Sequence, residues 1–254
     1  MPPTTPERYA VVSCHVERPL DDRVWGAFSA LQERRPGGLV IAGLLRPPDP
    51  DAGETDDDLW VSRAREAAAR GPLGHHTHFT SPTHARPTGG GTGARVRREG
   101  AWIRERGLMP SLFCGGGWYT DQAVALACAE LGYADCTARA TRPPYLADGA
   151  AWAELDTPAR IDLGERVLVA VPTTHGAGDL ARALVRPELP LQIHAYFHDT
   201  DLVDRARRTM IAAALALLGR RRPPFELDAV AASVSGPVRP WSGVARGGAA
   251  EPRA

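Results

Sequence analysis

Four of the eight histidines in this 254-residue chain, His75, His76, His78 and His84, fall within ten residues of one another. Imidazole is the side chain that most often binds divalent metal ions, and its nitrogen must lie about 2 Å from the ion. A metal site therefore needs several such side chains close together. We interpret this segment as the edge of a metal site.

The segments around these histidines are expected to form an α/β fold. Apolar runs alternate with amphipathic helical segments, which is the pattern of a parallel sheet built from βα units. The predicted strands are residues 9–14, 39–45, 73–77, 111–114, 133–137, 167–172 and 189–194, and residues 225–232 are expected to form a closing strand and turn. The predicted helices begin near Asp21 or Asp22 and then cover about residues 59–70, 94–106, 120–131 and 209–218.

Residues with reactive or metal-binding side chains gather at the carboxyl ends of these predicted strands. They form four segments, at residues 14–17, 76–84, 114–119 and 194–201. In a β/α barrel the loops at this end of the strands converge on one opening, where the active site lies. We therefore expect the four segments to meet.

Composition predicts one large domain with no electrostatic preference for a polyanion. Hydrophobic residues make up 43% of the chain, which is enough for a sizeable core. The thirty basic residues, all arginine, balance thirty acidic residues, so neither nucleic acid nor an anionic membrane is expected as a partner. We expect an N-terminal extension at 1–8, the domain at 9–232, and a disordered tail at 233–254 that is rich in Gly, Pro and Ala.

The expected compartment is the cytoplasm. The four cysteines contain no Cys-x-x-Cys pair, and a domain of this size needs no disulfide framework. The first residues lack the basic start and apolar core of a signal peptide, and no apolar run is long enough to span a membrane.

Ordered motifs across residues 9–232 resemble those of a known family. They are Ser-Cys-His-Val-Glu-Arg-Pro at 13–19, Gly-His-His-Thr at 74–77, Phe-Cys-Gly-Gly-Gly-Trp-Tyr at 113–119, Leu-Gly-Tyr at 131–133 and Leu-Gln-Ile-His at 191–194. In this order they resemble the motifs of the polysaccharide deacetylases with NodB homology, the carbohydrate esterase family 4. The resemblance implies a distorted (β/α) barrel of about seven parallel strands, and hydrolysis of an N-acetyl group on a sugar.

The resemblance also implies roles for individual residues. His76 takes the place of a metal ligand, His194 that of the general acid, and Glu17 that of a metal-binding aspartate. Backbone amides of the loop that contains Gly117, Trp118 and Tyr119 are expected to help form an oxyanion hole. Trp118 and Tyr119 are also placed to stack on a sugar ring.

The chain departs from the family pattern at three positions. The family's general-base aspartate is replaced by Val16, so His15 or Glu17 would have to act in its place. The family's second metal histidine is replaced by Thr80, and its base-orienting arginine by Cys114. His78 and His84 are the nearest replacements for that histidine, and His84 reaches the metal only if Ser81-Pro82 turns the loop back.

Metal-assisted hydrolysis requires parts that this chain can supply. Two imidazoles and one carboxylate suit a catalytic zinc or a similar divalent ion. The expected ligands are His76, Glu17 and either His78 or His84, with Asp22 as a substitute for Glu17. His194 is the expected proton donor, and the residues expected to orient it are His198, Asp199 and Asp201.

The first hypothesis is a metal-dependent hydrolase that removes an N-acetyl group from a sugar or a sugar-linked intermediate. A second is a deacetylase-like barrel that has lost turnover and binds a carbohydrate or a partner protein. A third is a barrel amidohydrolase that acts on a non-sugar amide. The fold alone does not separate the three, because function belongs to the site.

Overall fold

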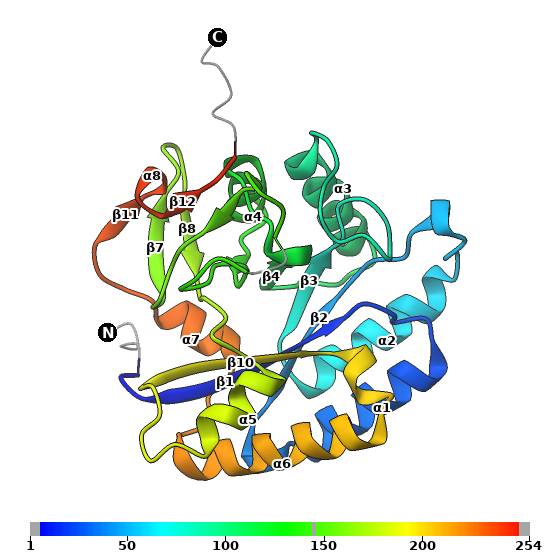
Figure 1. The fold of residues 1–254 in the computed structure, drawn as a ribbon. Coiled ribbons are helices and arrows are strands. Elements are labelled where there is room, and N and C mark those ends of the chain that lie inside the picture. Colours follow the sequence, from blue (N-terminus) through cyan, green and yellow to red (C-terminus); the bar gives the residue numbers. More distant parts are fainter. Residues whose placement is uncertain (1–5, 144–145, 249–254) are drawn as a thin grey trace.

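The computed structural model describes residues 6–143 and 146–248, which form an α/β fold around one largely parallel sheet (Figure 1). The sheet has ten strands in the order β11-β7-β8-β5-β4-β3-β2-β1-β10-β9. All neighbouring pairs are parallel except β7 with β8. The predicted α/β class with a mainly parallel sheet is confirmed.

Seven of the ten strands lie on the predicted segments. They are β1 (Tyr9–Val16), β2 (Ile41–Leu45), β3 (Leu73–Thr77), β4 (Leu112–Gly115), β5 (Ala134–Asp135), β8 (Val167–Ala170) and β10 (Gln192–His198). The other three are β7 (Ala159–Asp162), β9 (His175–Gly176) and β11 (Val238–Pro240), and β6 (Trp152–Ala153) pairs separately with β12 (Ala245–Arg246).

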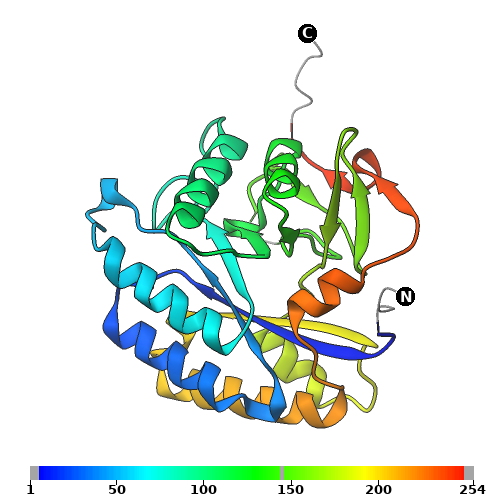
Figure 2. The ribbon, with the colours of Figure 1, turned by 180° about the vertical axis from the view of Figure 1, so that it is seen from behind.

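Most of the helices cover the outside of the curved sheet, and α7 lies against its inner face (Figures 1 and 2). They are α1 (Asp22–Arg34), α2 (Asp57–Arg70), α3 (Thr92–Glu105), α4 (Gln122–Glu130), α5 (Ala177–Leu184) and α6 (Arg205–Arg221), followed by the short α7 (Leu227–Ser233) and α8 (Trp241–Val244). Asp21, Asp56, Asp121 and Asp204 begin α1, α2, α4 and α6, because each carboxylate accepts hydrogen bonds from free backbone N–H groups of the first turn.

The alternation of side chains along β1 separates an outer core from an inner one. Val12 and Cys14 belong to the apolar cluster under α1 and α6, whereas Val11 belongs to a cluster on the opposite face of the sheet. That inner cluster also contains Leu227 and Val230 of α7. The inside of the curved sheet is therefore a packed core with α7 against it.

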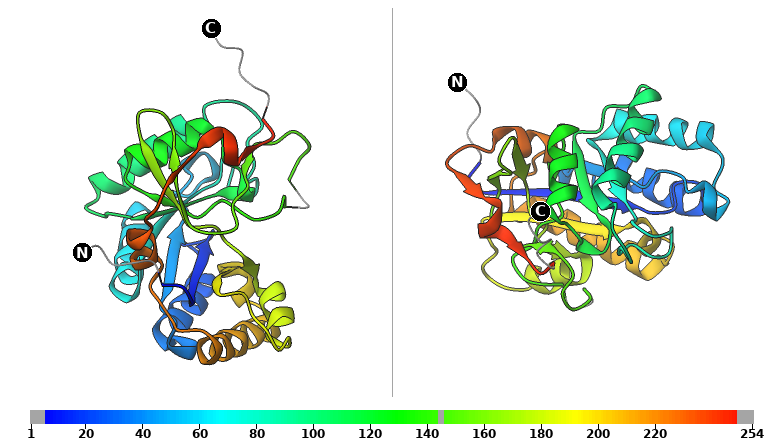
Figure 3. Two further views of the ribbon diagram at one scale, coloured as in Figure 1. Left: turned by 90° about the vertical axis from the view of Figure 1, so that its left-hand side faces the viewer. Right: turned by 90° about the horizontal axis from the view of Figure 1, so that it is seen from above.

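Two expectations about the C-terminal part are wrong. Residues 227–233 form α7 instead of a closing strand. The tail that was expected to be disordered from residue 233 instead contributes β11, α8 and β12, and it runs beside β7 and β8 (Figure 3). Val244 is buried in the apolar cluster that also holds Leu168, so this segment has a core to pack against. The remaining tail residues, 249–254, and residues 1–5 of the expected extension lie outside the described part of the chain.

None of the helices in the described ranges is both long enough and apolar enough to cross a lipid bilayer.

Candidate metal centre

Strand alternation sorts the clustered histidines onto opposite faces of β3. His75 points outward, where its Nε2 lies 2.9 Å from the Glu99 carboxylate of α3 and 2.9 Å from the Thr77 hydroxyl. His76 and His78, at the alternate positions, face the inside of the curved sheet. His75 is thereby held in a structural contact, and the other two are left for the site.

Glu17, His76 and His78 bring three ligand atoms together at the carboxyl ends of β1 and β3. The Glu17 Oε1 lies 3.3 Å from His78 Nε2 and 3.9 Å from His76 Nε2. The two Nε2 atoms are 3.1 Å apart. Both histidines are buried, and the Glu17 side chain is one quarter exposed. The predicted combination of Glu17, His76 and His78 is therefore brought to one place.

The hydrogen bonds of the two rings fit metal binding. His76 Nδ1 lies 2.8 Å from the Cys114 carbonyl oxygen, and His78 Nδ1 lies 2.9 Å from the Pro82 carbonyl oxygen. A carbonyl only accepts, so each Nδ1 carries a proton and each ring turns its Nε2 toward Glu17. The two Nε2 atoms and Glu17 Oε1 are close enough to share a proton, and a divalent cation between them would take all three as ligands. This donor set suits a divalent ion, and the backbone carbonyls fix the tautomers as metal sites require.

The charges of the donors agree with that assignment. Burial raises the pKa of Glu17, but the neighbouring imidazoles of His78, His198 and His76 outweigh it and lower the pKa to about 2. Burial, together with His78, lowers the pKa of His76 well below its usual value. The site therefore combines an ionised carboxylate with a neutral imidazole at neutral pH.

His84 is not a member of this cluster. The loop does turn back, because His84 N donates to Ser81 O and Ser81 N donates to His84 O. However, the turn places Pro82 O on His78 Nδ1 and leaves the His84 side chain exposed on the rim of the cavity. Asp22, the other substitute, pairs with Arg63 on the outside of the fold. Of the ligands that the sequence left open, the geometry favours His78 over His84 and Glu17 over Asp22.

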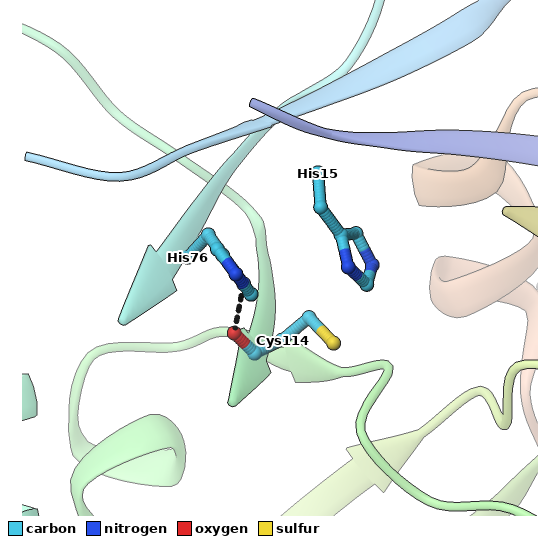
Figure 4. A group of neighbouring side chains, drawn as sticks. All are labelled: His15, His76 and Cys114. Carbon is cyan, nitrogen blue, oxygen red and sulfur yellow. Dashed lines mark hydrogen bonds between the residues drawn. The ribbon is translucent and has the colours of Figure 1, made fainter. Parts of the chain in front are cut away.

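His15, His76 and Cys114 form a second group of potential ligands within 4.8 Å of one another (Figure 4). The His15 ring stacks on His76 at 4.8 Å between centroids, and its buried Nε2 has no hydrogen-bond partner within the described ranges. Burial and the surrounding imidazoles lower the pKa of His15 well below its usual value, whereas burial raises that of the Cys114 thiol. A metal bound there would have to displace the thiol proton, whereas the Glu17 carboxylate is already ionised, so we take the group with Glu17 as the metal site.

His198 stands beside Glu17 at the end of β10. Its Nε2 lies 3.7 Å from Glu17 Oε1, and its Nδ1 lies 3.8 Å from the Asp201 carboxylate. Burial lowers the pKa of His198, but the carboxylates of Asp201 and Glu17 outweigh it and raise that pKa above its usual value. Asp201 therefore supports His198.

Asp199 supports the loop that carries Glu17. Its buried carboxylate accepts a hydrogen bond from Arg18 N at 2.8 Å, which joins the end of β10 to the residue after Glu17. In the described part of the chain, the His194 ring forms a hydrogen bond with Ser13 and not with Asp199 or Asp201. The orienting contacts expected for His194 are thus made elsewhere.

His194 does not reach the cavity. It precedes His198 by four residues on the same strand, which is about 13 Å of extended chain. There it is buried, and its Nε2 lies 2.9 Å from the Ser13 hydroxyl. Burial lowers the pKa of His194 to about 4. The expectation that His194 opens onto the site is therefore wrong, because His194 lies near the start of β10 and the cavity lies at the end of that strand, beside His198.

A cavity of about 740 Å³ opens above this cluster. It is lined by His15, Glu17, His76, His84, Arg86, Gly117, Trp118, Tyr196 and His198, among others. Gly117 and Trp118 are thus placed as expected, and both have positive φ angles of 62°. Tyr119 is not: its hydroxyl donates to Asp121, 2.7 Å away, and its ring packs against Phe79.

Sequence reasoning missed Tyr196, which lines the cavity, and Arg139, which lies over the rings of Trp118 and Tyr196. The Tyr196 ring stacks on His15 and meets Trp118 edge-on at 4.7 Å between centroids. The Arg139 guanidinium lies 4.7 Å above the Trp118 ring and donates to the Tyr196 hydroxyl at 2.9 Å. Tyr196 lies two residues before His198 on β10, so both side chains share the inner face, and this spacing could have indicated Tyr196 from the sequence. No sequence pattern indicated Arg139.

No family model matches the sequence, and neither does any curated protein. Among solved structures, the 4-alpha-glucanotransferase of Thermococcus litoralis matches with a TM-score of 0.55 and 12% identity, over 91% of this chain and 39% of that one. A family 4 carbohydrate esterase from Streptomyces lividans, in complex with acetate, gives a TM-score of 0.46 and 14% identity, over 84% of this chain and 90% of that one. The chain thus spans about two fifths of the glucanotransferase. At this identity the likeness shows the fold alone.

Proposed function

We propose that this protein is a metal-dependent hydrolase that removes an acyl group, most simply N-acetyl, from a sugar or a sugar-linked compound. The observation that carries the proposal is the convergence of His76 Nε2, His78 Nε2 and Glu17 Oε1, with both Nδ1 atoms bound to backbone carbonyls. Two of the three residues, Glu17 and His76, line a cavity large enough for a monosaccharide unit.

Zinc is the ion that this donor set fits best, with Glu17, His76 and His78 as its protein ligands. When bound, such an ion polarises the acyl oxygen and lowers the pKa of water toward about 7. Gly117 lines the same cavity, so we assign its backbone N–H to that oxygen, in agreement with the role implied by the family resemblance.

Two histidines are assigned to proton transfer. His198 faces the cavity with Asp201 behind it, so we assign to it the donation of a proton to the leaving nitrogen, in place of His194. His15 also lines the cavity, and no described residue forms a hydrogen bond with its Nε2, so we assign to it the acceptance of a proton from the attacking water.

Carbohydrate is favoured as the substrate class by the walls of the cavity. Trp118 and Tyr196 offer aromatic surfaces of the kind that sugar rings stack on. The motifs that resemble the deacetylases, and the glucanotransferase with the same fold, point to the same class. The four unpaired, buried cysteines support the expected cytoplasmic location.

The test combines metal analysis with acetate release. We expect about one zinc ion per purified chain, its loss in His78→Ala, and its retention in the matched control His84→Ala, whose side chain lies on the rim. Wild-type protein should release acetate from N-acetylated amino sugars. Stoichiometric zinc with acetate release only from non-sugar amides would favour a barrel amidohydrolase. A protein that binds no metal would overturn the proposal and leave a carbohydrate- or protein-binding barrel.

A further inference from the structure

We infer that the cavity beside the metal centre holds a phosphate group of the substrate on the guanidinium of Arg86. The inference rests on the proposed function and deepens it, because it restricts the substrate to acylated sugars that carry a phosphate. Arg86 is then the residue that determines specificity, whereas Glu17, His76 and His78 bind the metal ion.

Arg86 lies on the loop that borders the metal centre. It lines the cavity, and so does Gly117. A Cβ on Gly117 would lie 2.6 Å from Arg86 Cγ and 3.4 Å from Arg86 Cδ, so the stem of the arginine packs directly over that glycine. A Cβ on the neighbouring Gly116 would lie 2.9 Å from Ala85 Cβ and 3.0 Å from His78 Cδ2. Arg86 and the metal ligand His78 therefore lie against successive residues of one loop.

This contact distinguishes Arg86 from the other arginines. All thirty basic residues of the chain are arginine, so an exposed guanidinium alone indicates no site. Arg86 is exposed, but it is the only arginine among the described residues that line the cavity. Its backbone is also held, because its carbonyl oxygen accepts a hydrogen bond from the Thr80 hydroxyl. An arginine with a packed stem loses less conformational entropy on binding an anion than one whose stem lies in solvent.

The charges and donors that line the cavity favour a phosphate. Glu17 is the only carboxylate among the described lining residues, and it belongs to the metal centre. A divalent ion bound there more than balances its charge, and Arg86 adds a further positive charge. A planar guanidinium can bind two oxygens of a phosphate, and a hydroxyl can donate to a third. Thr83 and Thr88 supply such hydroxyls on the same segment of the cavity wall.

A phosphorylated sugar has a suitable size to contact both groups. The cavity volume, about 740 Å³, lies within the range of pockets that hold small ligands. Arg86 and the metal ligand His76 both line it. Such a molecule can therefore present its acyl group at the metal centre and its phosphate at Arg86.

The test measures binding of sugars that have no acyl group, so that it does not depend on hydrolysis. Glucose, glucose 1-phosphate, glucose 6-phosphate and glucuronate are titrated by calorimetry into zinc-loaded and metal-free protein. We expect at least one phosphate to bind about tenfold or more tightly than glucose in both forms, and glucuronate to gain less. Arg86→Gln should abolish the preference, Arg86→Lys should retain part of it, and Arg220→Gln, at an exposed position of α6, should leave it unchanged.

Equal affinities for glucose and both phosphates would overturn the inference. So would a preference that persists in Arg86→Gln or disappears when the metal is removed, because the phosphate would then bind elsewhere or on the ion. Glucuronate that binds as tightly as the better phosphate would overturn the assignment to phosphate. If Arg86→Gln fails to fold, Arg86→Lys carries the test, since a full preference in that variant would contradict recognition by the planar guanidinium. Release of acetate from a neutral sugar would keep the proposed function even if this inference failed.

Discussion

At the scale of the residue, Asp135 is the clearest case of a buried carboxylate whose ionisation lowers the stability of the fold. This carboxyl is buried, and its Oδ1 accepts hydrogen bonds from the backbone N–H and the hydroxyl of Thr137. Thr137 in turn accepts a hydrogen bond from Gly115 N, which begins the loop beside the metal cluster. Burial raises the pKa of Asp135 to about 6 despite these bonds.

We expect Asp135→Asn to stabilise the protein at pH 7.5 but much less at pH 4.5. The pKa of Asp135 is about 6 in the folded protein and near the ordinary aspartate value of 3.8 in the unfolded chain, so the unfolded chain releases its proton first as pH rises. Wild-type stability should therefore fall between these two values and stay lower above them, by roughly 2–3 kcal/mol. Urea unfolding of both proteins at the two pH values measures the difference. Equal differences at both would contradict the account.

At the scale of the element, packing requires the glycines where β4 ends and the next loop begins, Gly115 and Gly116. A Cβ on Gly116 would lie 2.7 Å from Thr77 O and 3.0 Å from His78 Cδ2, and one on Gly115 would lie 2.3 Å from Tyr119 O. The loop therefore passes against the back of the His78 ring. Together with Pro82 O, it sets the direction in which His78 Nε2 points.

Gly116→Ala should consequently weaken zinc binding by about tenfold or more, because it displaces a ligand from its orientation. It should also destabilise the fold by about 1–3 kcal/mol through overpacking. The control is Gly26→Ala in α1, where a Cβ meets nothing within 4 Å and helix propensity favours alanine. Competition with a zinc-binding dye and urea unfolding give the two quantities. Unchanged zinc affinity in Gly116→Ala would show that the loop does not orient His78.

The sequence predicted those elements whose patterns are long enough to read. Strand β3 was predicted to the residue, and β1 within two residues, because their apolar runs are bounded by turns. Strands of two or three residues, such as β9 and β11, contain no measurable period. Helix α7 was mistaken for a strand because seven residues show less than two helical turns.

The candidate site was predictable in part, for the same physical reason. His76, His78 and Glu17 were found because ligand-type residues at strand ends are visible in the sequence. His194 was misplaced because the strand continues to His198, four residues beyond the predicted end. Arg139 was not found because its position follows from stacking on Trp118, a contact that only the fold creates.

At the scale of the whole molecule, the segment that follows α7 completes the outer core. Val244 is 4% exposed within the apolar cluster beneath α4 and β8, and Trp241 packs against the same cluster. The strand pair of β12 with β6 ties this segment to the chain that follows β5. The fold thus depends on residues that composition alone assigned to a disordered tail.

Val244→Asp should accordingly lower the free energy of unfolding by several kcal/mol, because it places a charge in an apolar cluster. The control is Val238→Asp in β11, where the side chain is 39% exposed and the same change should cost about 1 kcal/mol or less. Urea unfolding measures both. Similar small losses in the two variants would show that the segment does not pack as described.

The central claim is that two imidazoles and one carboxylate, from distant parts of the chain, hold one metal ion. X-ray absorption spectroscopy of the zinc-loaded protein tests it most directly, because zinc–sulfur and zinc–nitrogen distances differ, at about 2.3 and 2.0–2.1 Å. We expect only nitrogen and oxygen neighbours, two of them imidazoles, and the loss of one imidazole in His78→Ala but not in His84→Ala. A sulfur neighbour would place the ion at Cys114 and His15 instead, and it would contradict the account.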